Sequence, residues 1–355
     1  MPRISILLCA LFLTAATPAP HPAPHPAPHA SPRPVRVAHF DHIFVIVEEN
    51  KNAERIVGDD DAPALTALAK QYGYASQFYA ETHPSEPNYV AMVGGSTYGI
   101  RDDDAYYCHA NDARPSCSNS RRPGYADHTI DRPSLASLID AKGLTWKNYD
   151  EDLPAPGSLA VSSHLYASKH DGFINYLSVQ KDPRLAEKMV GFDRLFADLR
   201  TGDVPTFSLI VPNLCDEMHG TGNPLDGLDC SYAIREKLIG RGDANAKRIV
   251  DAIIASPVWR AKGNAAIVIT FDEDDGGGRA GCCGNDPNDP ANAGGGHIAT
   301  LVITNHGPRG VVDPTPYSHY SLLRTIQDAL GLQPYLGRAG APGVVPMIPL
   351  FGAAR

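Results

Sequence analysis

Short apolar runs alternate with helical patterns along this chain from Val37 onward. The runs are rich in β-branched residues and almost continuously hydrophobic, which is typical of strands buried on both faces of a sheet. They cover residues 43–47, 206–211, 265–271 and 299–304. Helical spacing of apolar residues covers 62–71, 134–141, 244–254 and 320–330. This alternation predicts an α/β fold with a mostly parallel, doubly wound sheet.

Polar residues follow the predicted strands where each one ends. The groups that follow them are Glu48-Glu49-Asn50, then Asn213, Asp216 and His219, and then Asp272-Glu273-Asp274-Asp275. A β-like run at 76–80 leads in the same way to Ser85. Ligands bind at the carboxyl ends of strands in open parallel sheets, so these groups are predicted to form one site.

Ser85 lies in a turn flanked by Pro84 and Pro87, before a small-residue helical segment at 89–94. A helix start presents backbone N–H groups that favour an anion. A serine at that position can act as a nucleophile towards phosphorus or an acyl carbon. The alternative is that Ser85 only caps the helix, because serine is a preferred N-cap residue.

Two pairs of residues with side-chain oxygen ligands suggest a metal site. Glu49 and Asn50 offer oxygen ligands suited to a divalent cation, and Asp272 and Glu273 offer more across the sheet. Each pair alone could be a solvated loop, and the second could also be a calcium site. Together they predict one divalent cation, because clustered carboxylates would otherwise repel one another.

Several histidines have candidate roles. His219 follows a strand end and could be a ligand, a general acid or a phosphate donor. His170 lies beside a lysine and could face an anionic ligand, and His83 could orient Ser85. His297 and His319 are better explained by capping or loop packing.

Composition narrows the class of partner. The chain has 355 residues, 43% of them hydrophobic and 20% charged, as in ordinary globular proteins. Its net charge of −9 argues against nucleic acid or an anionic membrane surface as the main partner.

The first residues have the pattern of an export signal. Residues 1–16 combine Arg3, an apolar run and a small-residue cleavage site, and 17–35 form a Pro/Ala/His-rich linker. The apolar run is too short to span a bilayer, so no stable membrane anchor is expected. The rest, 36–355, is predicted to be a single catalytic domain that is secreted, extracellular or periplasmic, or associated with the cell wall.

Seven cysteines agree with export, and Cys9 belongs to the signal. Disulfides are therefore favoured over zinc. Three local pairs are candidates: Cys108 with Cys117, Cys215 with Cys230, and the adjacent Cys282 with Cys283. The adjacent pair is left open, as are other connectivities. It falls in a Gly/Asp/Asn-rich stretch, 276–296, that is predicted to be one long surface loop.

Seven segments in this order resemble one family. They are VIVEENKN at 45–52, ETHPSEPNY at 81–89, EDLPAPGS at 151–158, Lys169-His170, IVPNLCDEMHG at 210–220, ITFDEDDG at 269–276 and SHYSLLRTI at 318–326. They resemble the phosphoesterase family of phospholipases C and acid phosphatases, within the alkaline-phosphatase-like superfamily. The likeness is greatest to its secreted acid phosphatases.

That resemblance implies a three-layer α/β/α sandwich that hydrolyses phosphate monoesters. Ser85 matches the family's nucleophile and Asn88 a phosphate-contacting asparagine. Glu49 and Asn50 match one metal-site pair, and Asp272 and Glu273 match the other. His219 matches an active-site histidine, and His170 lies in a recurring segment. The implied substrates are small phosphorylated molecules, with phosphoinositides among the candidates.

Three other functions remain open from sequence. A phospholipase C or phosphodiesterase would share the fold, although this chain lacks the added C-terminal domains of the larger phospholipases C. A non-catalytic protein that binds phosphate or a cation would keep the acidic residues without needing the serine. A sulfatase would need an arginine that Ser85-Glu86-Pro87-Asn88-Tyr89 lacks.

Overall fold

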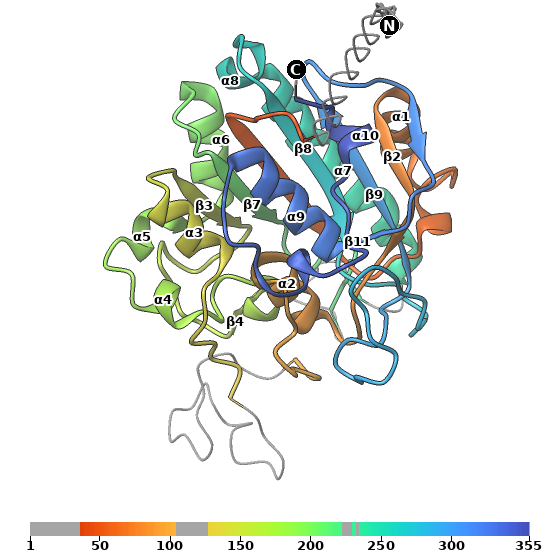
Figure 1. Ribbon diagram of the computed structural model, residues 1–355, viewed down its shortest axis with the longest axis horizontal. Helices are drawn as coiled ribbons and strands as arrows, with labels where there is room; N and C mark the ends of the chain where they lie inside the picture. The colour runs from red at the N-terminus through yellow and green to blue at the C-terminus, as the bar shows by residue number, and fades with distance from the viewer. Residues whose placement is uncertain (1–35, 104–126, 222–228, 232–233, 355) are drawn as a thin grey trace, which may run out of the picture. The chain divides into compact units, whose positions relative to one another are not determined.

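The computed structural model describes residues 36–103, 127–221, 229–231 and 234–354 (Figure 1). The residues from 36 onward form one compact unit. The predicted signal peptide, the linker and the Cys108–Cys117 pair lie outside the described residues.

A nine-stranded mixed sheet forms the centre of the described unit. Its order is β10-β2-β9-β8-β1-β7-β3-β6, with β11 also paired to β2. The strands are β1 His42–Glu48, β2 Gly73–Tyr79, β3 Trp146–Asp150, β6 Met189–Val190, β7 Phe207–Val211, β8 Ala265–Phe271, β9 His297–Thr304, β10 Val311–Asp313 and β11 Tyr317–Ser318. Among these strands only β9 pairs antiparallel with its neighbours, so the prediction of a mostly parallel sheet is confirmed.

Helices cover both faces of the sheet. Helix α9 (His319–Leu330) lies in front of the strands in Figure 1 and packs on α2 (Ser85–Gly94), which also contacts α3 (Leu135–Ala141). Helix α7 (Arg235–Ala255) lies behind the strands and packs with α1 (Pro63–Gln71), α6 (Phe192–Thr201) and α8 (Pro257–Arg260). This arrangement confirms the three-layer α/β/α sandwich.

Short elements complete the described part. They are β4 Ser162–Ser163, β5 Tyr166–Ala167, α4 Leu177–Gln180, α5 Leu185–Lys188, α10 Ile348–Phe351, and the 3-10 helices η1 Ala53–Arg55, η3 Ser168–His170 and η5 Gly337–Gly340. No described helix combines the length and the apolar character needed to cross a bilayer.

The strand predictions fit because these strands are buried throughout. All seven residues of β8 are buried, and β1 is buried after its first residue. The helix predictions are less complete. Helix α7 begins at Arg235, well before residue 244. The prediction began too late because Gly240 and Gly242 interrupt the apolar pattern of the first turns. Strand β3 and helix α6 were not predicted.

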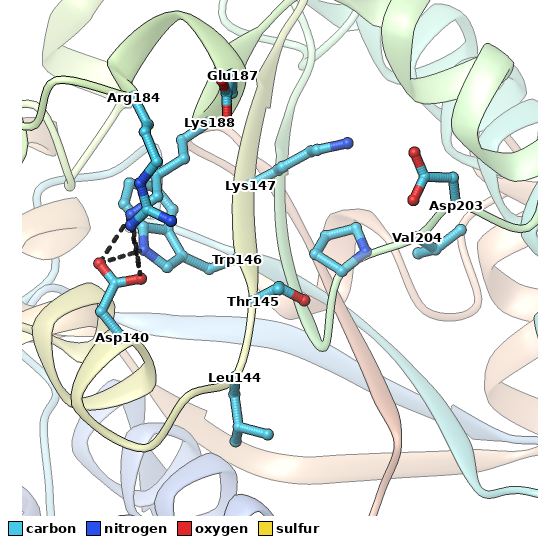
Figure 2. A pocket seen from close by; sticks show the side chains of 11 residues that line it. Asp140, Leu144, Thr145, Trp146, Lys147, Arg184, Glu187, Lys188, Asp203 and Val204 are labelled. Carbon is cyan, nitrogen blue, oxygen red and sulfur yellow. Dashed lines mark hydrogen bonds and ion pairs between the residues drawn. The ribbon is translucent and has the colours of Figure 1, made fainter.

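A cavity of about 180 Å³ lies at the amino-terminal end of β3. Figure 2 shows Arg184 and Lys188 turned toward Asp140 there. The ammonium group of Lys188 also pairs with Asp182 and lies 4.8 Å from the centre of the Trp146 ring. Because carboxylates and an aromatic face already engage these cations, we interpret this cavity as a packing feature and place the functional site at the opposite edge of the sheet.

Candidate active site

Ser85 is the first residue of α2, and Pro84 precedes it as N-cap without a side-chain hydrogen bond. The alternative that Ser85 caps the helix is therefore wrong. Its side chain instead points at two carboxylates. The Ser85 Oγ lies 3.2 Å from Glu49 Oε2 and 3.3 Å from Glu273 Oε1. The serine is only 2% exposed, so its hydroxyl is held in a protected site at the start of a helix.

Asn88 holds the turn that delivers Ser85. Its Oδ1 accepts hydrogen bonds from the N–H groups of Glu81 and Thr82, at 3.0 and 3.1 Å. Its Nδ2 donates to the carbonyls of Thr82 and Pro84, at 2.9 and 3.2 Å. The side chain is fully buried. In the structure Asn88 thus positions the turn, and its contact with phosphate stays a prediction.

The two predicted metal-site pairs, Glu49-Asn50 and Asp272-Glu273, meet beside Ser85. The Asn50 side chain donates from Nδ2 to Glu273 Oε1 at 2.7 Å, and its backbone N–H donates to Asp272 Oδ1 at 3.0 Å. Asn50 has a φ of 45°, a left-handed conformation that asparagine tolerates better than most residues. The ends of β1 and β8 therefore form one cluster, as their parallel pairing requires.

Burial raises the pKa values of the carboxyl groups in this cluster. It raises the pKa of Glu273 to about 7, although the hydrogen bond with His83 opposes that shift. It also raises the pKa values of Glu49 and Asp272, and for Glu49 the charge of Asp272 adds to the effect. A cluster of this kind is costly without a compensating cation.

His83 fixes the orientation of Glu273. Its Nδ1 lies 2.7 Å from Glu273 Oε2, and its Nε2 lies 2.9 Å from the Gly278 carbonyl. Burial lowers the pKa of His83, but the bond to the Glu273 carboxylate outweighs it and raises the pKa to about 9. His83 therefore acts on Ser85 indirectly, by holding the carboxylate that contacts the hydroxyl.

His170 lies between two buried carboxylates on the other side of Glu49. Its Nε2 is 3.2 Å from Glu49 Oε1 and its Nδ1 is 2.8 Å from Glu217 Oε1. The ring stacks on Tyr89 with 5.4 Å between centroids. Burial lowers the pKa of His170, so a neutral ring is favoured. Glu217 is fully buried and was not singled out from sequence.

His219 reaches the same place from the segment after β7. Its Nδ1 donates to the Gly220 carbonyl at 2.6 Å, so in the neutral ring the proton is on Nδ1 and Nε2 carries a lone pair. Burial lowers the pKa of His219 to about 4, and the charge of Lys169 adds to this effect. Among the predicted roles, this geometry favours a ligand over a general acid or a phosphate donor.

The donor set fits a metal ion in two adjoining places. One ligand atom each from Glu49, His170 and His219 lies within 4.8 Å of the others. On the Ser85 side, Asn50 Oδ1 and Asp272 Oδ2 are buried, and neither accepts a hydrogen bond within the described ranges. Carboxylate, amide and imidazole donors suit a borderline divalent cation. Glu49 belongs to both sets.

Lys51 ties the two strand ends of the site together. Its ammonium group donates to the carbonyls of Asn50 and Met218, at 2.9 and 3.0 Å, and the residue is 3% exposed. The position of Lys51, directly after the Glu49-Asn50 pair at the end of a predicted buried strand, is the signal that could have marked this lysine as a site residue in the sequence.

The other two histidines considered in the sequence, His319 and His297, contact backbone carbonyls or an exposed glutamate. His319 places Nε2 2.9 Å from the Phe271 carbonyl and supports the end of β8. His297 lies with Nδ1 2.9 Å from Glu54 Oε1 and Nε2 3.0 Å from the Ser76 carbonyl. Both contacts agree with the packing roles expected for these residues.

The 276–296 loop joins β8 to β9 without regular structure, as predicted, but it is not simply a surface loop. Ala291 and Asn292 are 2% and 1% exposed. The loop contains the Cys282–Cys283 disulfide, and Ser318 Oγ donates to the Cys283 carbonyl at 3.0 Å. The 276–296 loop is thus a packed wall next to the site. Outside this loop, a second disulfide joins Cys215 and Cys230.

Glu81 connects that wall to the Ser85 turn, and its burial predicts a pH effect on stability. Asn285 Nδ2 donates to Glu81 Oε2 at 2.7 Å. Burial raises the pKa of Glu81 from 4.5 to about 8. Between these values the folded chain holds a proton that the unfolded chain has lost, so this group makes folding less favourable as pH rises.

Glu81→Gln should therefore gain stability relative to the unmodified protein as pH rises through that window, by roughly 1 kcal/mol per pH unit. Denaturant unfolding of both proteins across the window measures the difference. The difference between the unfolding free energies of the two proteins is used because the other buried acids titrate in both and cancel. Two stability curves that stay parallel across the window would show that Glu81 is ionised in the folded protein.

A model of the Phosphoesterase family matches residues 58–333. The chain belongs to the Phosphoesterase family. The match contains Ser85, His219, Asp272 and Glu273, and it begins after Glu49 and Asn50. The predicted family is therefore confirmed.

Curated relatives of this phosphoesterase carry phosphatase names. The phosphatidylinositol-3-phosphatase of Mycobacterium tuberculosis is 30% identical over 82% of this chain and 78% of its own length. An acid phosphatase of Aspergillus fumigatus is 26% identical over 84% of this chain. A phosphate-repressible acid phosphatase of Penicillium chrysogenum is also 26% identical over 84%. The chain spans 56% and 61% of the two fungal proteins. These names agree with the predicted enzyme class.

Solved structures of other proteins share the fold of this phosphoesterase. A protein of the alkaline phosphatase superfamily from Vibrio parahaemolyticus superposes with a TM-score of 0.54 at 14% identity, covering 86% of this chain and 71% of that chain. A 2-O GAG sulfatase superposes with a TM-score of 0.50 at 12% identity, covering 88% of this chain and 74% of that chain. The alkaline-phosphatase-like architecture is therefore confirmed.

Proposed function

We propose that this phosphoesterase hydrolyses phosphate monoesters through a covalent intermediate on Ser85. The observation that carries the proposal is the Ser85 hydroxyl, buried at the start of α2 and within 3.3 Å of two carboxylates. A helix start favours the anionic phosphoryl group, and the carboxylates can take up the hydroxyl proton.

The reaction would proceed in two displacements. The Ser85 Oγ attacks phosphorus as its proton passes to Glu49 Oε2 or Glu273 Oε1, the bond to the leaving oxygen breaks, and that proton moves on to the alkoxide, which leaves as the alcohol. A water then attacks the phosphoserine, one of its protons passes through the same carboxylate to the Ser85 oxygen, and hydrogen phosphate leaves as the hydroxyl is regenerated. The Nδ1 of His83 lies 2.7 Å from Glu273 Oε2 and keeps this carboxylate turned toward Ser85 through both steps.

The residues that would hold a divalent cation are Glu49, Asn50, Asp272 and Glu273, with His170 and His219 as further donors on the far side of Glu49. Such a cation polarises a phosphoryl oxygen and lowers the pKa of the serine hydroxyl. The orphaned acceptors of Asn50 and Asp272 support this assignment.

Export is part of the proposal. The predicted signal segment supports it, and so do the Cys215–Cys230 and Cys282–Cys283 disulfides, which persist in oxidising compartments. Small phosphorylated molecules are the proposed substrates. The name of the mycobacterial relative adds phosphoinositide headgroups to the candidates.

A phosphate-release panel tests the function. The purified protein should release phosphate from monoesters such as p-nitrophenyl phosphate, inositol phosphates and short-chain phosphoinositides. Diesters such as bis-p-nitrophenyl phosphate should react far more slowly. Faster hydrolysis of diesters would identify a phosphodiesterase instead, and release from none of these esters would contradict an enzymatic role.

A further inference from the structure

The Cys282–Cys283 disulfide is accessible from solvent in the wall next to the candidate site. Both cysteines are half-buried, and the contact of Cys283 Sγ with the Pro316 carbonyl oxygen, at 3.0 Å, is exposed. The Cys215–Cys230 disulfide differs, because both of its residues are 0% exposed. Thiol–disulfide exchange requires that a thiolate reach a sulfur atom, so a thiol in solution can attack the first bond and not the second.

The ring that this disulfide closes holds a turn in the 276–296 loop. Cys283 has a φ of 28°, a left-handed conformation that is uncommon for a residue with a Cβ. Its carbonyl oxygen accepts a hydrogen bond from Ser318 Oγ at 3.0 Å, and Ser318 is the N-cap of α9. The Cys282 N–H donates to Asn285 Oδ1 at 2.8 Å. Opening the ring frees the backbone of both cysteines, so the geometry of these two hydrogen bonds depends on the disulfide.

Hydrogen bonds continue from this turn to the residue before the proposed nucleophile. Asn285 Nδ2 donates to Glu81 Oε2 at 2.7 Å. The Glu81 N–H donates to Asn88 Oδ1 at 3.0 Å, and Asn88 Nδ2 donates to the Pro84 carbonyl at 3.2 Å. Pro84 is the N-cap of α2 and directly precedes Ser85. The side chains of Asn285, Glu81 and Asn88 therefore connect the disulfide turn with the start of α2.

We propose that Cys282–Cys283 is a thiol-exchange site, reduced by a low-molecular-weight dithiol and reoxidised by a disulfide, and that its oxidised form keeps the Ser85 turn in the active arrangement. The effect on turnover rests on the proposed phosphatase function, while the exchange itself does not depend on it. Nothing in the reaction at Ser85 uses these sulfur atoms, so the pair acts only by positioning the turn.

The exchange takes place in two displacements. One thiol of the dithiol loses its proton and attacks Cys283 Sγ, the bond between the two cysteine sulfurs breaks, and Cys282 leaves as a thiolate that takes up a proton. The second thiol of the reagent then attacks the reagent sulfur of the mixed disulfide. Cys283 leaves as a thiol, and the reagent leaves as a cyclic disulfide. Two electrons pass from the dithiol to the protein.

Reduction of the folded protein with dithiothreitol tests the exchange site. Alkylation with iodoacetamide, followed by peptide mass spectrometry, should find Cys282 and Cys283 modified while Cys215 and Cys230 stay joined. Circular dichroism of the same sample checks that the protein remains folded. A Cys282–Cys283 bond that stays intact, or a Cys215–Cys230 bond that is reduced first, overturns the proposal.

Reduction should also loosen the Ser85 turn. Hydrogen exchange in the peptide from Glu81 to Tyr89 should become about tenfold faster, because Asn88 holds the N–H groups of Glu81 and Thr82. The kcat on p-nitrophenyl phosphate should fall by about tenfold and recover when glutathione disulfide reoxidises the pair. If either the hydrogen exchange or the kcat stays unchanged in the reduced protein, the proposal is overturned.

The double variant Cys282→Ser with Cys283→Ser is the matched control. It should have the hydrogen exchange and the kcat of the reduced protein, and dithiothreitol should change neither. A dithiol also binds metal ions, and this variant keeps the candidate cation site. A loss of activity that dithiothreitol still causes in the variant therefore comes from chelation or from other cysteines and overturns the proposal. If the variant does not fold, reoxidation of the unmodified protein decides, because a loss that does not reverse also overturns it.

Two results separate this inference from the proposed function. An enzyme that releases phosphate with the same kcat in both redox states contradicts the role of the disulfide alone. A protein that hydrolyses no ester contradicts the proposed function, and the alkylation and hydrogen-exchange measurements then decide whether the pair exchanges and holds the turn.

Discussion

Ser85→Ala is expected to lower kcat on p-nitrophenyl phosphate by about 10³-fold or more, because the proposed covalent intermediate forms on the Ser85 oxygen. The hydroxyl makes only side-chain contacts with Glu49 and Glu273, and Pro84 rather than Ser85 is the N-cap of α2. Its loss should therefore leave the helix and the fold intact. Steady-state phosphate release and circular dichroism on the same preparation measure both effects.

Ser85→Thr is the matched control for that substitution. It keeps a hydroxyl at the start of α2 and should keep measurable turnover, at a reduced rate because an added methyl group must fit a site that is 2% exposed. A folded Ser85→Ala protein with activity within about tenfold of the unmodified protein would contradict the nucleophile assignment.

Removal of the proposed divalent cation is expected to lower activity by more than about 100-fold. The reason lies in the carboxyl cluster: Glu49, Asp272 and Glu273 are buried together, and burial raises their pKa values, so a bound cation would stabilise their charged forms. Dialysis against a chelator, followed by addition of single divalent cations, measures the loss and identifies the ions that restore phosphate release.

Asp272→Asn tests the same site from the side of the protein. It removes a ligand charge but keeps an oxygen that can accept the Asn50 N–H, so the loop should stay in place. We expect weaker cation binding by calorimetry and a higher cation concentration for half-maximal activity. Full activity after exhaustive chelation, with no metal detected by elemental analysis, would contradict the metal site.

The sequence predicted that the candidate site residues lie together because they directly follow buried strands of one sheet. The uninterrupted apolar runs of β1 and β8 could only be internal strands, and the Glu49-Asn50 and Asp272-Glu273 pairs follow directly after them. Their parallel register then brings the pairs together. Ser85 was predicted to join them because it follows the carboxyl end of β2 in the same way.

The side-chain partners could not be predicted in the same way. His170 and Glu217 are 2.8 Å apart in space but belong to η3 and to the segment after β7, and no local pattern connects them. The hydrogen bonds that Asn88 makes with the backbone of its own turn were not predicted either, while its contact with phosphate stays a prediction. Strand β3 was missed because its sequence, WKNYD, contains three polar residues and no aliphatic one, although four of its five residues are buried.

Trapping the covalent intermediate tests the central claim most directly. The enzyme is mixed with a phosphate monoester, quenched in acid within the first turnovers, digested and examined by mass spectrometry. The proposed mechanism predicts one phosphoryl group on Ser85 in the peptide that contains Glu81 to Tyr89, and none in the Ser85→Ala protein. Rapid hydrolysis with Ser85 unmodified at every quench time, or a phosphoryl group on another residue of the site such as His219, would contradict it.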